Sequence, residues 1–313
     1  MKLLTKAMQD DMARQMTFKA RDIDMTLYNA LDGSMERDFV LDSLMLYRTK
    51  DGGFAGGLYI DNYNTNTSVY QIYEAFRLLD MVDFDSNCDN ELYTDIVNKA
   101  CNYLFNRCEM IDNKWNPNVK SNDDFAHSKE FSFTNENKEL FGYHPTAAIL
   151  GYTLKFHKPT KAYYKKALAC ATKMINDFMS MDKLTKYEFI SFNSFYNSVK
   201  NLGLFSDKLD ALKDKLIKMA EEVVSDDFNN DDAIKPLDCA FYISSKKLDE
   251  LKDKQLDFII DSIAPFGLWD HKKSWGYDKY AEEDSAMIKW VGAETVNNYF
   301  VLKKYGRIEQ KVI

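Results

Sequence analysis

The sequence contains few of the residues that interrupt helices. Its 313 residues include 12 glycines and 5 prolines, and the glycine content is about half of average protein usage. No alternation of apolar and polar residues lasts long enough to predict a β-sheet. Apolar residues instead recur at the helical spacing of three and four along most of the chain. These features predict an all-α protein.

Cysteine is also scarce. The five cysteines are Cys88, Cys101, Cys108, Cys170 and Cys239. They form no Cys-x-x-Cys pair, and most of them lie inside helical patterns. An odd number of cysteines without metal-type spacing favours reduced, buried thiols over a disulfide framework. The pattern is typical of a protein from a reducing compartment.

Excess positive charge and long apolar runs are both missing. Lys and Arg number 41 against 49 Asp and Glu, which gives a net charge of −8, whereas a nucleic-acid partner requires a concentrated basic face. No run approaches the roughly eighteen apolar residues of a membrane span, and the first residues lack the apolar region of a signal peptide. We therefore expect a cytoplasmic protein that neither binds nucleic acid nor spans a membrane.

Glycine is concentrated in one stretch, residues 48–57, which holds four of the twelve. Such a cluster allows positive φ and close approach of the backbone, and Phe54 between the glycines can fold back as a plug. Helical patterns precede it at 35–47 and follow it at about 65–81. This stretch therefore predicts an outer helix, a glycine-aromatic turn and an inner helix.

Two kinds of helical segment alternate along the rest of the chain. Charged, surface-type helices are predicted at 91–108, 161–180, 207–225 and 247–263. Aromatic-rich, buried partners are predicted at 145–157, 184–202, 237–243 and 285–303. Together with an N-terminal helical segment, 1–34, these hairpins form a repeat architecture. We expect one domain, 1–313, folded as an (α/α) toroid of five to six helical hairpins in two concentric rings.

The longest irregular stretch is the loop 109–143. It is too aromatic for a disordered segment, and long loops in compact domains are usually functional. In a ring whose outer helices all point the same way, the loops between outer and inner helices gather at one mouth. We therefore expect this loop to form a lid or a wall of a pocket at that mouth.

The turn at residues 50–58 (Lys-Asp-Gly-Gly-Phe-Ala-Gly-Gly-Leu) is similar to the repeat of terpenoid cyclases and protein prenyltransferase β subunits. The other segments that resemble a bacterial branch of this superfamily are 20–24, 115–117, 124–127, 145–148, 235–236 and 269–308. They are spread over nearly the whole chain. The resemblance implies an α/α toroid with a central pocket, and it implies the fold more firmly than an activity.

Two motifs of the characterised relatives are absent. The chain has no Asp-x-Asp-Asp run, with which class II terpene cyclases protonate their substrates, and Asp238-Cys239 does not reproduce the zinc-ligand spacing of protein prenyltransferases. The acidic run 226–232 differs from both in spacing and is either a cation site or a solvated loop. These departures argue against protein prenylation. They predict no metal site and leave the cofactor unknown.

The candidate catalytic residues are Asp61, His127, Glu188 and Asp270. The three carboxylates fall in or just before apolar, aromatic segments, where burial raises a carboxyl pKa toward that of an acid catalyst. The alternative for each of them is a helix cap or an ion pair. His127 lies beside two aspartates and is predicted to be either a general base or part of a hydrogen bond within the loop.

The candidate substrate-binding residues are aromatic: Trp115, Trp269, Trp275, Tyr277 and Trp290. Aromatic faces at a pocket mouth can stabilise a carbocation or stack on sugar rings. The alternative is that they plug the turns between repeats, as Phe54 is expected to do.

Three functions remain open. The first is a terpenoid-cyclase-like enzyme that acts by acid catalysis on a small apolar substrate, which requires a deep aromatic cavity containing a carboxyl group. The second is a carbohydrate-active (α/α)-barrel hydrolase or lyase with paired carboxylates and aromatic platforms. The third is a binding or scaffold toroid without catalysis. A small-molecule ligand is expected, and no oligomeric state follows from the sequence.

Overall fold

The computed structural model describes residues 1–276 and 279–310, and these are mostly helical. The first helices are α1 (Lys6–Lys19), α2 (Asp22–Asp32), α3 (Phe39–Met45), α4 (Val69–Met81), α5 (Glu91–Arg107) and α6 (Asn135–Phe141). The later ones are α7 (Thr146–Phe156), α8 (Ala162–Met179), α9 (Lys186–Val199), α10 (Ser206–Val223), α11 (Pro236–Cys239), α12 (Lys246–Asp261) and α13 (Glu282–Lys304). The predicted all-α character is confirmed. No helix in the described ranges combines the length and the apolar character needed to cross a membrane.

Side-chain caps fix where several helices begin. The capping residues that accept a hydrogen bond from a first-turn amide are Thr5, Ser68, Asn90, Thr134, Thr185 and Ser245. Each satisfies an amide that has no partner within its own helix, which is why Ser, Thr and Asn are favoured there. With these caps, most helices begin and end within a few residues of the predicted ranges.

Two predicted helical segments are shorter or more broken than expected. The N-terminal segment is two helices, because Ala20 and Arg21 are extended between α1 and α2. The buried segment predicted at 237–243 is helical only over the single turn of α11. Beyond that turn, the Lys252 ammonium donates to the carbonyls of Ala240 and Ile243, so a side chain replaces the hydrogen bonds of a continuing helix.

The predicted loop 109–143 is ordered by short elements of its own. It contains a small antiparallel pair, β1 (Met110–Ile111) and β2 (Lys114–Trp115), two 3₁₀ turns at Lys120–Asp124 and Lys129–Phe131, and helix α6. The sequence prediction missed these elements because each is at most seven residues long, which is too short for a clear periodic pattern.

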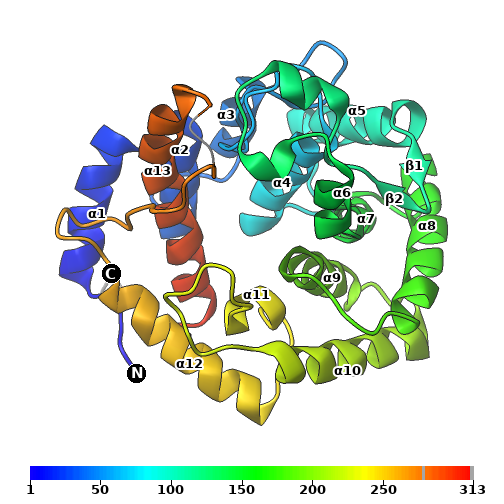
Figure 1. Ribbon diagram of the computed structural model, residues 1–313. Helices are drawn as coiled ribbons and strands as arrows, with labels where there is room; N and C mark the ends of the chain where they lie inside the picture. Colours follow the sequence, from blue (N-terminus) through cyan, green and yellow to red (C-terminus); the bar gives the residue numbers. More distant parts are fainter. Residues whose placement is uncertain (277–278, 311–313) are drawn as a thin grey trace.

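The helices are arranged around a common centre (Figure 1). Helices α1, α5, α8, α10 and α12 lie at the periphery, while α4, α7, α9, α11 and α13 lie nearer the middle. The two chain ends meet, since the Leu4 amide donates to the Arg307 carbonyl and the Glu309 amide donates to the Leu4 carbonyl. The Arg307 guanidinium also pairs with Asp253 and Asp257 of α12. The first and last segments therefore lie side by side.

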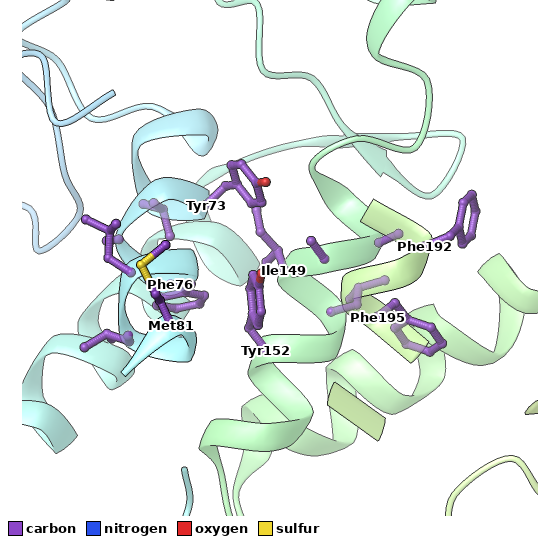
Figure 2. Close-up of a cluster of buried hydrophobic side chains, with 14 of the residues drawn as sticks. Tyr73, Phe76, Met81, Ile149, Tyr152, Phe192 and Phe195 are labelled. Carbon is purple, nitrogen blue, oxygen red and sulfur yellow. The ribbon is translucent and has the colours of Figure 1, made fainter. Parts of the chain in front are cut away.

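The inner helices are packed on most of their faces. In Figure 2, Ile149 and Tyr152 of α7 lie between the aromatic side chains of α4 and those of α9, and every residue of α7 except Lys155 is buried. Gly151 allows α7 and α9 to approach closely, because a Cβ atom there would lie 2.8 Å from the Phe195 Cα. The core is thus built around helices that are apolar or aromatic nearly all round.

We expect Gly151→Ala to destabilise the protein by about 1–3 kcal/mol, the usual range for an overpacked core. The added methyl meets backbone rather than a flexible side chain, which outweighs the gain in helix propensity of about 1 kcal/mol. Urea unfolding gives the free-energy change. The control is Thr172→Ala on the exposed face of α8, which should be neutral or slightly stabilising, and equal stability of the two variants would contradict the close packing.

Candidate functional site

A cavity of about 410 Å³ lies among the inner helices, within the size range of small-molecule sites. Helices α4, α7, α9, α11, α12 and α13 all contribute to its wall. Its aromatic lining consists of Trp290, the two phenylalanines Phe241 and Phe300, and the six tyrosines Tyr59, Tyr70, Tyr73, Tyr152, Tyr187 and Tyr242. The wall therefore combines ring faces with phenolic hydroxyl groups.

Charged side chains from α4 also line this cavity. The Arg77 guanidinium donates to both oxygens of Glu74 at 2.8 Å, and it donates to the Asn297 side chain of α13 at 2.9 Å. One turn further on, the Lys155 ammonium of α7 lies 2.6 Å from Asp80. Two carboxylates and a guanidinium are thus held in fixed geometry by neighbouring helices.

Burial changes the acidity of these groups. It raises the pKa of the Asp80 carboxyl, although the nearby Lys155 charge opposes the change. Burial alone would lower the pKa of the Arg77 guanidinium, but the Glu74 carboxylate raises it overall. Arg77 is therefore a permanent cation, and Asp80 is the cavity carboxyl whose pKa moves toward the range of an acid catalyst.

His144 forms part of the cavity wall just before α7. Its Nδ1 lies 2.7 Å from the Ser191 hydroxyl, and its Nε2 lies 3.2 Å from the Tyr70 hydroxyl. Burial lowers its pKa to about 3, so the ring is neutral at physiological pH. A neutral imidazole between two hydroxyls sets their orientation and adds no charge.

The structure brings three predicted site residues together next to the cavity. Asp61 Oδ1 accepts from the indole nitrogens of Trp275 at 2.8 Å and Trp290 at 2.6 Å. Trp290 lines the cavity, and the His271 ring stacks on it with centroids 5.0 Å apart. Burial raises the pKa of Asp61, while the two indole donors lower it in part. Asp61 thus positions a cavity tryptophan and does not itself line the cavity.

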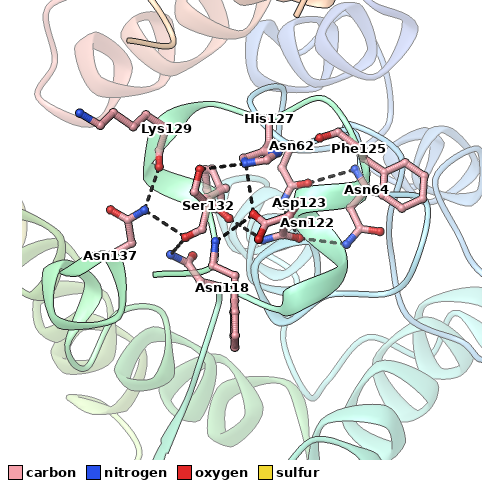
Figure 3. A network of polar contacts seen from close by, with 12 residues as sticks. Asn62, Asn64, Asn118, Asn122, Asp123, Phe125, His127, Lys129, Ser132 and Asn137 are labelled. Carbon is pink, nitrogen blue, oxygen red and sulfur yellow. Dashed lines mark hydrogen bonds and ion pairs between the residues drawn. The ribbon is translucent and has the colours of Figure 1, made fainter. Parts of the chain in front are cut away.

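His127 lies in a polar network of the loop 109–143 (Figure 3). Its Nδ1 contacts the Phe125 carbonyl at 2.7 Å, its Nε2 contacts the Ser132 hydroxyl at 3.0 Å, and Asp123 is 3.7 Å away. Burial lowers its pKa. These contacts correspond to the hydrogen-bonding alternative of the sequence prediction, and the residue does not line the central cavity.

The other two predicted catalytic carboxylates lie elsewhere. Glu188 Oε2 accepts from the Thr185 amide in the capping box of α9, and Glu188 Oε1 accepts from the Tyr143 amide. This carboxylate corresponds to the helix-cap alternative. Asp270 is exposed to solvent. The structure brings neither of them to the cavity or to Asp61.

Trp115 and Trp269 are buried next to turns. The Trp115 amide donates to the Thr146 hydroxyl at the start of α7, and its ring packs edge-on against Phe105. The Trp269 indole donates to the Ile259 carbonyl at the end of α12. Both correspond to the plug alternative and lie outside the cavity lining. Tyr277, the remaining aromatic candidate, lies outside the described residues.

The sequence analysis did not select the charged cavity residues of α4. A signal for them exists, because Tyr70, Tyr73, Arg77 and Asp80 recur at helical spacing and form a second stripe beside the apolar one. Charged residues inside an otherwise apolar and aromatic helix indicate a polar interior site. Asn297 and Asn298 of α13 carry a weaker signal, since amides in a helix of mixed composition are common.

The acidic run 226–232 is a solvent-facing loop. Its four aspartates are exposed, and the Asp227 side chain accepts from the Asn229 amide within the loop. Among residues 1–276 and 279–310, no three His, Cys, Asp or Glu side chains are grouped so that they could hold a metal ion.

Comparison with known proteins gives no relative for this chain. Neither a protein-family model, nor a curated protein, nor a solved structure matches it. The function must therefore be argued from the cavity itself.

We expect Asp61→Asn to remove a pH-dependent cost of folding. Because burial raises the pKa of Asp61, its contribution to stability is present below the unfolded-state pKa and is lost as the pH rises through the folded-state pKa. The variant should therefore gain stability relative to wild type between about pH 4 and pH 7, by about 1.4 kcal/mol for each unit of raised pKa.

Urea unfolding monitored by tryptophan fluorescence measures both proteins across this pH range. The control is Asp270→Asn, which removes an exposed carboxylate from the same region and should show no such gain. Parallel pH profiles of wild type and Asp61→Asn would contradict the assigned burial cost.

Proposed function

We propose that this chain is an (α/α) toroid that binds a small, hydroxyl-rich molecule, such as a mono- or disaccharide, in its central cavity. Of the three functions left open by the sequence, this is closest to the carbohydrate-active one. The ring of peripheral and central helices in Figure 1 supports the toroid assignment, as does the meeting of the two chain ends.

The observation that carries this proposal is the polarity of the cavity wall. Besides the tyrosine hydroxyls and the ion pair of α4, the lining includes the four amide side chains Asn193, Gln255, Asn297 and Asn298. Asn193, Gln255 and Asn297 already bond to protein groups, whereas the Tyr73 hydroxyl and the Asn298 amide have no hydrogen-bond partner within the described residues. A purely hydrocarbon ligand would remove such unbonded groups from water without giving them partners, which costs about 1–3 kcal/mol for each group. A ligand with many hydroxyls supplies both donors and acceptors.

The lining also explains how a ring-shaped ligand is held. Trp290 and the tyrosines offer faces against which the apolar side of a sugar ring can stack. Arg77, Glu74 and Asn297 form a fixed set of donors and acceptors on one wall. Asp80 is the lining carboxyl suited to donate a proton to a glycosidic oxygen, because burial raises its pKa. The reaction class this supports is hydrolysis or elimination at a glycosidic bond.

A second candidate is terpenoid-cyclase-like acid catalysis on a small apolar substrate. The observation that favours it is the combination of Asp80, with its raised pKa, and neighbouring tyrosines such as Tyr152 and Tyr242. Aromatic faces stabilise a carbocation formed after protonation. The Tyr73 hydroxyl and the Asn298 amide of the lining weigh against it, because a hydrocarbon supplies no hydrogen bond to them.

The test is a ligand screen with a matched pair of variants. Neutral mono- and disaccharides and isoprenoid alcohols are compared by thermal shift and titration calorimetry. Tyr73→Phe removes a hydroxyl from the cavity wall and should weaken saccharide binding up to about tenfold, the upper value for one neutral hydrogen bond. Tyr93→Phe is the control, because that hydroxyl is buried, lies away from the cavity and has no hydrogen-bond partner in the described ranges.

The outcomes separate the alternatives. Saccharide binding that is weakened by Tyr73→Phe and unchanged by Tyr93→Phe supports the proposal. Binding of isoprenoid alcohols without saccharides would overturn it in favour of the cyclase-like candidate. If neither ligand class binds, the chain is a scaffold toroid and the proposal fails. If wild type turns over a saccharide that Asp80→Asn binds but does not turn over, the chain is an enzyme.

A further inference from the structure

A second cavity, of about 500 Å³, adjoins the central one. The two share four lining residues, Asp80, Met81, Tyr242 and Phe300, so they form adjacent compartments. The second cavity is lined by residues near the C-terminal ends of α4, α7, α9 and α13. It therefore lies at the end of the inner helices that is opposite to the glycine-rich turn and the loop 109–143.

Positive charge distinguishes this second cavity. Its lining includes the cations Arg37, Lys155, Lys303 and Lys304, against the carboxylates Asp80 and Asp83. Of the four cations, Lys155 is paired with Asp80. Arg37 donates to the Asp83 main-chain carbonyl and Lys303 to that of Leu31.

No carboxylate lies within ion-pair distance of Arg37, Lys303 or Lys304 in the described part of the chain. Three cations in one cavity thus lack a directly paired anion. All three side chains are exposed, so an anion can reach them from solvent.

The effect of these charges extends to neighbouring groups. The pKa of the Lys200 ammonium is lowered, first by burial and then by the positive charge of Lys304. The same Lys304 charge acts on Asp80 at the junction of the two cavities. Like charges are therefore held close together here, which an anion would relieve.

The helix ends oppose this positive charge. Each helix C-terminus carries roughly half a negative elementary charge, and the effect fades within the last turn. The Lys303 ammonium is itself bound at such an end, because it donates to the Leu31 carbonyl in the last turn of α2. The ammonium of Lys304, in the last turn of α13, has neither an ion pair nor a hydrogen bond within the described residues, so it is the cation most available to an anion.

We infer that the second cavity is a binding site for a small dianion, specifically a phosphate group. The excess positive charge matches a dianion, and lysine ammonium groups bind phosphate oxygens as point charges while arginine offers a planar fork. The phosphate is either free inorganic phosphate or the phosphate ester of a ligand whose remaining part occupies the central cavity. The site itself does not depend on what the central cavity binds.

The test is titration calorimetry with inorganic phosphate, glucose 6-phosphate and glucose at constant ionic strength, with potassium chloride as the salt control. Lys304→Gln should weaken phosphate binding about tenfold, which corresponds to one charge-assisted contact. Lys165→Gln is the matched control, because it makes the same charge change on an exposed position of α8. Lys304→Glu should abolish phosphate binding, and circular dichroism verifies that each variant is folded.

The result expected is phosphate binding to wild type that is weakened by Lys304→Gln and unchanged by Lys165→Gln. If glucose 6-phosphate binds more tightly than both glucose and inorganic phosphate, the ligand of this site is a phosphate ester. If glucose 6-phosphate and inorganic phosphate bind equally, the ligand is free phosphate. Absence of phosphate binding to wild type, or equal weakening in both lysine variants, overturns the inference. If wild type binds phosphate but no saccharide, the result counts only against the proposed function.

Discussion

The Glu74–Arg77 pair in the middle of the molecule is the interaction on which the arrangement of the site depends. Two charges removed from water cost several kcal/mol each, and their attraction offsets this only with good geometry and further hydrogen bonds. Here both carboxylate oxygens are bound at 2.8 Å, and Asn297 accepts from the remaining side of the guanidinium. The pair joins α4, the first long inner helix, to α13, the last one. A core built for stability alone would be served as well by apolar residues of the same size, so the pair supports the proposed ligand-binding function.

The part of the cavity wall near the N-terminal end of α4 is held by polar contacts as well as by packing. Asp61 fixes Trp290 at the cavity wall, and Tyr187, another lining residue, donates to Glu130, which in turn pairs with Lys273. These contacts connect the glycine-rich turn, the loop 109–143 and the segment before α13. Cavity aromatics are thus positioned by buried or half-buried polar groups, and a change in any of these groups acts on the cavity at a distance.

The sequence predicts the helices well and the site only in part. Periodicity places helices such as α8 and α12 within two residues, because their apolar stripes are long and regular. The sequence does not predict that α11 ends after one turn. Beyond that turn the Lys252 ammonium, from another helix, bonds to the Ile243 carbonyl, and this is a tertiary contact. Burial in an aromatic segment pointed to Asp61, but the same argument selected Glu188, whose carboxylate caps a helix. Pattern alone does not distinguish a buried cap from a buried acid, because both require a carboxylate next to apolar residues.

The central claim is that the Glu74–Arg77 pair of α4, with Glu74 buried and Arg77 half-buried, is there for a ligand. The most direct measurement combines the free energy of unfolding with saccharide affinity for the double variant Glu74→Leu/Arg77→Met. The account predicts unchanged or higher stability, as for other buried ion pairs replaced by apolar residues, together with loss of binding. A stability loss of about 3–5 kcal/mol, the usual cost of breaking a buried pair, or binding equal to that of wild type, would contradict it.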